Sequence, residues 1–233
     1  MRPELAGPAA CHPYPAFGAM PAPAPQRPLW DTLAVFAECR ATTLATGALV
    51  DDSPTRLPYP NPPLEDGVVR LRRWEERDFA CVAAAATDPR IPSGTTVPAM
   101  YSEAEGTAFI KRQWGRQSDG EGLSLAIEGE ATSTAVGLIA LLFRPEPFVA
   151  GVGYWVIPEA RGRRIAERAV ALLAPWALHQ ESVRRVEAFV DPANLASVRA
   201  LEGSGFKKEG LLRSYLKGSH DAFIYSLLPA DLE

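Results

Sequence analysis

Residues 153–166 read Gly153-Tyr154-Trp155-Val156-Ile157-Pro158-Glu159-Ala160-Arg161-Gly162-Arg163-Arg164-Ile165-Ala166, and this stretch decides the fold of the 233-residue chain. Its apolar first half, ended by a proline, predicts a strand over residues 151–157. The turn that follows is rich in glycine and arginine and leads directly into a pattern with helical spacing. The first N–H groups of a helix lack intrahelical acceptors and lie at the positive end of its dipole. The segment therefore predicts either a pyrophosphate site or a solvated basic turn that caps an ordinary helix.

A second informative segment lies downstream. Residues 190–206 read Val190-Asp191-Pro192-Ala193-Asn194-Leu195-Ala196-Ser197-Val198-Arg199-Ala200-Leu201-Glu202-Gly203-Ser204-Gly205-Phe206. This pattern predicts the end of a strand over 185–190 and a short helix over 194–204, ended by a glycine. Taken alone, Asn194 and Ser197 are most simply a helix cap and a surface hydroxyl.

The rest of the pattern is that of one mixed α/β domain from about residue 67. Alternating and apolar runs predict strands at 68–72, 123–127, 136–143, 208–216 and 222–228, with helices at 75–87, at 102–117 and from 163 onward. Ser102 and Glu105 form a capping-box pattern, and Pro175 is expected to kink or shorten the helix that contains it. Elements in this order predict helices on both faces of a twisted sheet.

Residues 1–66 differ in composition from the rest. They hold more than half of the 22 prolines, which favours polyproline II or disorder. Residues 29–50 have helix-like content. We therefore expect a Pro-rich, partly helical or disordered extension over 1–66. It could be a flexible leader, pack on the domain over 67–233, or pair with another chain.

The bulk composition narrows the function classes. The formal net charge is −4 and 47% of the residues are hydrophobic, which disfavours a non-specific nucleic-acid binder. The three cysteines are far apart and form no CxxC pair, so we expect neither a zinc site nor a disulfide framework. No apolar stretch long enough to cross a membrane and no secretory signal are readable, so we expect a cytoplasmic protein.

The two segments together resemble the GNAT acetyltransferase superfamily, and within it the RimJ/RimL-like branch, over about residues 67–230. Residues 161–166 lie on the family's acetyl-CoA loop, written [R/Q]-x-x-G-x-[G/A]. Asn194, Ser197 and residues 201–206 lie on its N-x-x-S…L-E-x-x-G-F segment. The C-terminal residues 209–228 are similar to the closing hairpin of the branch. The resemblance implies the GNAT-type acyl-CoA N-acyltransferase fold, with a mostly antiparallel sheet.

The resemblance also implies acetyl-CoA as cosubstrate and no metal. The backbone of Val156 and Ile157 would pair with the pantetheine arm like an added strand, and Asn194 would hydrogen-bond that arm. Arg199 joins the expected cofactor-binding residues. The pyrophosphate would be held by the loop residues Arg161, Gly162, Arg163, Arg164, Ile165 and Ala166, whose three arginines would add positive charge.

The implied reaction is direct attack of a primary amine on the thioester. A backbone N–H near Val156 would stabilise the oxyanion, and Asn194 would help to place the thioester. Ser197 or Tyr215 would protonate the leaving thiolate. The acceptor would be a protein N-terminus or a small metabolite, with no nucleic acid and no membrane involved. Homodimers are common in this superfamily.

The sequence departs from the family pattern at two positions. Arg164 stands where the family has the central loop glycine; arginine keeps its N–H and can adopt helical φ. Ser214, rather than the glutamate common in this branch, precedes Tyr215. Candidate general bases are Glu103, Glu105, His220 and Asp221, or water alone. The departures leave one alternative, a non-catalytic acyl-CoA sensor or interaction module that uses the Pro-rich extension.

Overall fold

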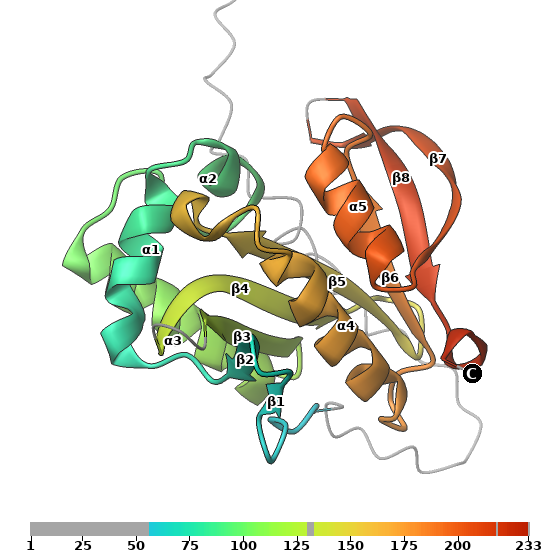
Figure 1. Ribbon diagram of the computed structural model, residues 1–233, viewed down its shortest axis with the longest axis horizontal. Helices are drawn as coiled ribbons and strands as arrows, with labels where there is room; N and C mark the ends of the chain where they lie inside the picture. Colours follow the sequence, from blue (N-terminus) through green and yellow to red (C-terminus); the bar gives the residue numbers. More distant parts are fainter. Residues whose placement is uncertain (1–55, 130–132, 218, 233) are drawn as a thin grey trace, which may run out of the picture.

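The computed structural model describes residues 56–129, 133–217 and 219–232 (Figure 1). The expectations for residues 1–55, including the helix-like segment at 29–50, lie outside the described residues. The described chain forms one eight-stranded sheet. Its strands are β1 Leu64–Glu65, β2 Val69–Arg72, β3 Gly122–Gly129, β4 Thr134–Phe143, β5 Val149–Val156, β6 Arg185–Val190, β7 Lys207–Leu216 and β8 His220–Leu227.

The sheet has the order β1-β2-β3-β4-β5-β6-β8-β7. All neighbouring strands are antiparallel except β5 and β6, which are parallel. This mixed, mostly antiparallel sheet confirms the predicted fold class. Helices α1 Phe79–Ala86 and α2 Arg90–Gly94 lie at one end of the molecule, and the β7–β8 hairpin lies at the other (Figure 1).

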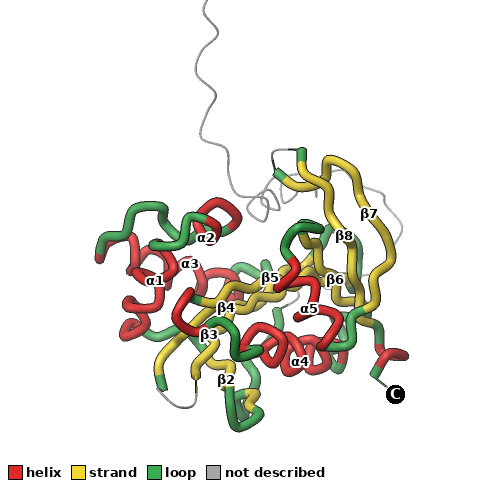
Figure 2. Tube along the Cα trace, turned by 45° about the horizontal axis from the view of Figure 1, so that its top comes forward, coloured by secondary structure: helices red, strands yellow, loops and turns green. Residues whose placement is uncertain are grey.

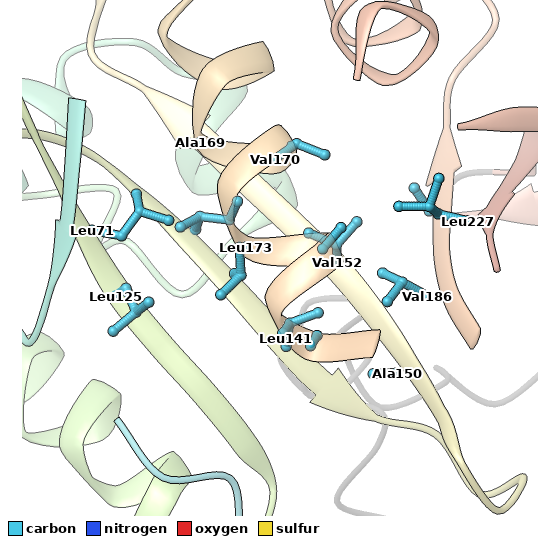
Figure 3. Packing of buried hydrophobic residues seen from close by; sticks show 14 of the residues in the cluster. Leu71, Leu125, Leu141, Ala150, Val152, Ala169, Val170, Leu173, Val186 and Leu227 are labelled. Carbon is cyan, nitrogen blue, oxygen red and sulfur yellow. The ribbon is translucent and has the colours of Figure 1, made fainter. Parts of the chain in front are cut away.

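One face of the sheet is covered by α4, Ile165–Leu178, and α5, Leu195–Gly203. The apolar stripe of α4 packs across the middle strands, where Leu173 and Val170 lie against Leu71, Leu141 and Val152 (Figure 3). Figure 2 shows both helices on the same side of the strands. Because this cluster spans β2 to β8, it holds the two halves of the sheet together.

The opposite face is covered over its first half by α1 and by α3, Glu103–Ser118. Trp74, Phe109 and Trp155 form an aromatic cluster there, with ring centroids 5.4 to 6.3 Å apart. The two faces of β5 therefore pack on different helices. Helices on both faces of the sheet were predicted, and this prediction is confirmed.

The folded core begins before residue 67. The side chain of Leu57 is 1% exposed and belongs to the cluster under α4, and Tyr59 packs against the same cluster. The Leu57 carbonyl also accepts a hydrogen bond from Gln117 Nε2 at 3.2 Å. Residues 57–66, which the sequence analysis assigned to the extension, thus contribute to the domain. A short segment between prolines carries no periodicity, so its burial could not be predicted.

The local sequence patterns predicted some helix ends and missed other elements. Ser102 Oγ accepts a hydrogen bond from the Glu105 N–H at 3.2 Å, which confirms the serine half of the predicted capping box of α3. Helix α4 continues through Pro175 to Leu178. The short strand β1 and helix α2, which contains Pro92, had no usable sequence signal. No helix among the described residues has the length and apolar character that crossing a membrane requires.

Candidate active site

The two parallel strands separate partway along their length. β5 and β6 stay in register only as far as Gly151 and Glu187. β5 continues to Val156, still paired with β4, and β6 continues to Val190, still paired with β8. The sheet therefore opens into a gap whose two sides are unpaired backbone edges. We call it the β5–β6 gap.

Strand alternation determines which β5 groups face this gap. The Ile157 N–H donates to Val136 O on β4 at 3.0 Å, so its backbone points away from the gap. Successive residues of a strand point their N–H and C=O groups to opposite sides. The backbone groups of Val156 and Tyr154 are therefore directed into the gap. The Val156 carbonyl accepts a hydrogen bond from Arg161 Nε at 3.1 Å, whereas its N–H stays on the gap edge.

This geometry corrects the expectation for Ile157. Its N–H is bonded to β4 and its carbonyl accepts from the Ala160 N–H at 3.1 Å. Neither group can pair with an extended chain inserted in the gap. Of the two residues expected to bind the pantetheine arm, Val156 is the one whose N–H lies on the gap edge. The pairing register that decides this is invisible in the sequence.

The gap leads to the N-terminus of α4. The first helical hydrogen bond runs from the Arg168 N–H to Arg164 O, and no side chain of the described residues caps the helix. The first-turn N–H groups, including those of Ile165 and Ala166, therefore have no side-chain acceptor. They provide the arrangement of amides and dipole that binds a phosphate. The predicted position of the anion site thus has the required backbone geometry.

Arg164 adopts a left-handed backbone conformation, with φ of 56° and ψ of 23°. The sequence analysis noted that an arginine can adopt a helical φ; here the residue takes a left-handed φ instead. A left-handed arginine costs about 1–2 kcal/mol relative to glycine, which explains the glycine preference of the family loop. Gly162 is also left-handed, with φ of 78°. The loop thus keeps its turn, and the steric cost of the left-handed conformation falls on Arg164.

Two of the three loop arginines are already paired with carboxylates. Arg164 Nε donates to Glu167 at 2.8 Å, and its Nη2 also bonds the Glu167 carboxylate. Arg161 Nη1 bonds Asp88 at 2.6 Å. Hydrogen bonds from Arg90 and then from Arg161 hold the pKa of Asp88 well below its usual range. The expected gain in positive charge from Arg161 and Arg164 is therefore largely neutralised.

Arg161 instead braces the loop. Its guanidinium joins the carbonyl at the end of β5 to Asp88, a buried residue of the segment between α1 and α2. Arg163 is exposed and lines a hollow of about 340 Å³ on the α1 side of the loop, next to Cys81 and Glu159. The hollow adjoins the loop and lies on the opposite face of the sheet from α4 and α5.

Asn194 and Ser197 lie at the start of α5. Asn194 Oδ1 accepts the Ser197 N–H at 3.2 Å, so the capping role is present. The Asn194 side chain is exposed, and its Nδ2 has no hydrogen bond to the described residues. One side chain can therefore cap the helix and still donate to a ligand. Arg199 is on the exposed side of the same helix.

Tyr154 is a site residue to which the sequence analysis gave no role. Its hydroxyl donates to the Ser197 carbonyl at 3.3 Å, so it links β5 to α5 across the β5–β6 gap. Burial raises the pKa of Tyr154 to about 12, and the hydrogen bond to Ser197 opposes that shift. Tyr154 therefore stays a neutral donor at physiological pH. The sequence did contain a signal for this position, because Tyr154 lies two residues before Val156 and therefore on the same face of the strand.

Tyr215 lies on the opposite face of the sheet. Its ring stacks on Phe189 with centroids 4.7 Å apart and an interplanar angle of 24°. On β6, Ala188 and Val190 belong to the cluster under α4 and α5, so Phe189 points the other way. Tyr215 is 43% exposed. The structure therefore separates Tyr215 from Ser197, which lies on the α5 face.

The general-base candidates are unequal in position. His220 Nδ1 lies 3.7 Å from Asp191 Oδ2, at the carboxyl end of β6 where the gap is open. Asp221 accepts a hydrogen bond from the Ser214 N–H at 2.9 Å and supports the left-handed turn there. The other two candidates, Glu103 and Glu105, are exposed in the first turn of α3. Within the described ranges no cluster of three metal-ligating side chains occurs.

Comparisons with known proteins agree with this geometry. A family profile described as "Acetyltransferase (GNAT) domain" matches residues 69–207, more than half of the chain. The probable N-acetyltransferase YjcK of Bacillus subtilis is 37% identical over 84 residues, which cover 35% of this chain and 46% of that protein. The uncharacterized N-acetyltransferase p20 of Bacillus licheniformis is 25% identical over 162 residues, covering 68% of this chain and 91% of that protein.

A solved structure shows the same arrangement of elements. RimJ of Mycobacterium smegmatis, in complex with CoA-disulfide, superposes with a TM-score of 0.63 and 26% sequence identity, covering 73% of this chain and 87% of that one. The resemblance to the RimJ/RimL-like branch is thereby confirmed. The profile match, the β5–β6 gap and the uncapped α4 terminus agree, and the chain belongs to the GNAT family of acetyl-CoA-dependent N-acetyltransferases.

Proposed function

We propose that this protein transfers the acetyl group of acetyl-CoA to a primary amine, on a protein N-terminus or a small metabolite, by direct attack. The observation that carries the proposal is the continuity of the unpaired β5 edge with the uncapped N-terminus of α4. The edge matches the hydrogen-bonding needs of an extended amide-containing arm, and the terminus matches those of a pyrophosphate. One elongated ligand can satisfy both.

In the proposed complex the first-turn amides of α4, including those of Ile165 and Ala166, hold the pyrophosphate. The arm runs along the gap beside Val156, and Asn194 Nδ2 donates to it from the other side. Because Arg161 and Arg164 are paired with Asp88 and Glu167, backbone amides supply most of the anion affinity. Arg163 and Arg199 are exposed and stay available for the outer phosphates.

The acetyl-CoA thioester supplies an activated acyl group. The neutral amine forms a bond from its nitrogen to the carbonyl carbon, the nitrogen of the resulting tetrahedral adduct loses one proton to a base or to water, and the C–S bond breaks. A gap-facing N–H, that of Val156 or Tyr154, stabilises the negative charge that develops on the carbonyl oxygen. The leaving thiolate takes its proton from Ser197 on one face of the sheet or from Tyr215 on the other.

His220 with Asp191 is the best-placed candidate for accepting the amine proton, since both lie at the open end of the gap. Histidine is the side chain that most often accepts a proton in enzyme active sites. Glu103 and Glu105 serve the first turn of α3, where acidic side chains stabilise the helix dipole. Water remains the competing acceptor.

The second candidate function is an acyl-CoA sensor without catalysis. The neutralised loop arginines favour it, because they weaken the electrostatic part of cofactor binding. Two measurements distinguish the enzyme from the sensor. The first is titration of the protein with acetyl-CoA and with CoA, and the second is release of free thiol from acetyl-CoA in the presence of a panel of amines. Micromolar binding with amine-dependent thiol release supports the enzyme. Binding without release for every amine supports the sensor, and absence of binding at millimolar ligand removes both.

Replacing Arg164 with glycine is expected to leave CoA affinity within about threefold of wild type, because Glu167 already neutralises the arginine. Folding stability should stay equal or rise by up to about 1 kcal/mol, since glycine relieves the left-handed strain. Arg164→Ala is the matched control: it loses the same charge and keeps the strain. Titration with CoA and thermal unfolding measure both effects. A loss of affinity above about tenfold in both variants would show that the Arg164 charge contacts phosphate.

A further inference from the structure

Arg144 follows the last residue of β4 and lies beside the start of the β5–β6 gap. Its guanidinium carbon is 4.8 Å from the centre of the Phe189 ring. A Cβ added at Gly151 would lie 2.9 Å from Arg144 Nε, so the guanidinium packs directly against the backbone of Gly151. The arginine is therefore held between a strand backbone and an aromatic ring.

Arg144 differs from Arg161, Arg164 and Arg185, each of which is paired with a carboxylate. Its Nε is buried and makes no hydrogen bond to the described residues. The acidic side chain in register with Gly151 is Glu187, which Arg185 holds at 2.7 Å. Glu209 is likewise engaged by Arg185 and by Ser226. Within the described ranges, Arg144 takes part in no ion pair with a carboxylate.

The position of Arg144 points to the acceptor rather than to the cofactor. Asn194 and the α4 terminus place the cofactor on the α4/α5 face. An amine must then approach the gap from the opposite face, where Arg144, Phe189 and Tyr215 form one row, here called the Arg144 platform. Between this platform and the far end of β5, Gly153 has open space beside it. Among the described residues, the strand surface at Gly153 between the platform and the gap is therefore not covered by a neighbouring side chain within 4 Å.

We infer that Arg144 binds a carboxylate of the acceptor. Preferred acceptors therefore carry a carboxylate roughly 10 Å from the reacting nitrogen. This distance corresponds to three strand residues, from Gly151 to Tyr154, at about 3.3 Å each. Guanidinium binds carboxylate in a planar, two-bonded geometry, and the aromatic ring on one side partly excludes water. The inference rests on the proposed function, because it assigns the acceptor class of the same site. The carboxylate can belong to a small metabolite or to an acidic residue near a protein N-terminus.

The test compares matched acceptors that differ only in charge. The small-molecule arm uses 8-aminooctanoate against 8-aminooctanamide. The peptide arm uses Ala-Glu-Ala amide against Ala-Gln-Ala amide. We expect the acid of at least one pair to be favoured at least about tenfold in kcat/KM. In Arg144→Met, which keeps length and apolar contact, the preference should fall to within about twofold, while affinity for CoA is unchanged.

Arg184→Met is the control variant, because Arg184 also lies over an aromatic ring, Phe148, 5.7 Å away at the closed end of the two strands. It should keep the acid preference. Equal rates for acid and amide in wild type, or a preference that survives Arg144→Met, would overturn the inference. Titration of each acceptor into the CoA-saturated protein gives the same comparison without turnover. Selective binding without acetyl transfer would keep the inference and remove the proposed reaction.

Discussion

Replacing Asn194 with aspartate is expected to lower turnover at least about tenfold, equivalent to about 1.4 kcal/mol of transition-state stabilisation, without lowering the melting temperature. Asn194 Oδ1 caps α5 by accepting the Ser197 N–H, and an aspartate oxygen caps equally well. The substitution removes only the Nδ2 donor and places a negative charge where the cofactor arm is proposed to lie. Steady-state kinetics and thermal unfolding of the same preparation measure the two effects.

Two further variants separate charge from hydrogen bonding at this position. Asn194→Ser keeps a capping oxygen and adds no charge, so its turnover should fall with its stability nearly unchanged. Asn194→Ala loses both functions and should also lose about 1 kcal/mol of folding stability. Wild-type turnover in the aspartate and serine variants would show that Asn194 acts only as a helix cap.

Deleting residues 1–60 is expected to cost roughly 2–5 kcal/mol of folding stability, the range observed when a large buried aliphatic side chain is removed. The deletion removes Leu57, which is fully buried under α4, and Tyr59, which packs beside it. It also removes the acceptor of the Gln117 hydrogen bond. Chemical denaturation of the purified proteins gives the difference.

The matched control is a shorter deletion that ends at residue 55 and keeps Leu57. We expect this protein to unfold at a clearly higher denaturant concentration than the longer deletion, and Leu57→Ala in the full chain should reproduce most of the loss. Identical midpoints for the two deletions would show that residues 56–60 add nothing to the core. The burial of Leu57 moves the start of the domain ahead of residue 67, where the sequence pattern indicated it.

The helix starts and caps that the sequence analysis predicted correctly are local features. The α4 terminus depends on the order strand, turn and helix within fourteen residues. The capping oxygen of Asn194 and its acceptor N–H are three residues apart. The cap of α3 is equally local. Such contacts follow from spacing alone, since neighbouring residues of a helix start must meet whatever the rest of the chain does.

The partners of the charged side chains could not be predicted from the sequence. Arg161 is paired with Asp88, 73 residues away, and the pairing changes its role from anion binding to bracing the loop. Tyr154 meets Ser197 across 43 residues. Arg144 could be recognised only after Gly151 and Phe189 were placed beside it. The sequence does not reveal which residue pairs with a charged side chain. It therefore does not determine whether that side chain is free to bind a ligand.

The sequence by itself determined the fold class, the family and the place of the loop that precedes α4, because periodicity and short motifs encode them within one or two elements. Only the tertiary structure decided that Val156 and not Ile157 faces the β5–β6 gap, that Leu57 completes the core, and that Arg144 lacks a carboxylate partner among the described residues. These features depend on strand register and on packing between distant segments. A shift of one residue in register would reverse the backbone directions along β5, and no local pattern records that choice.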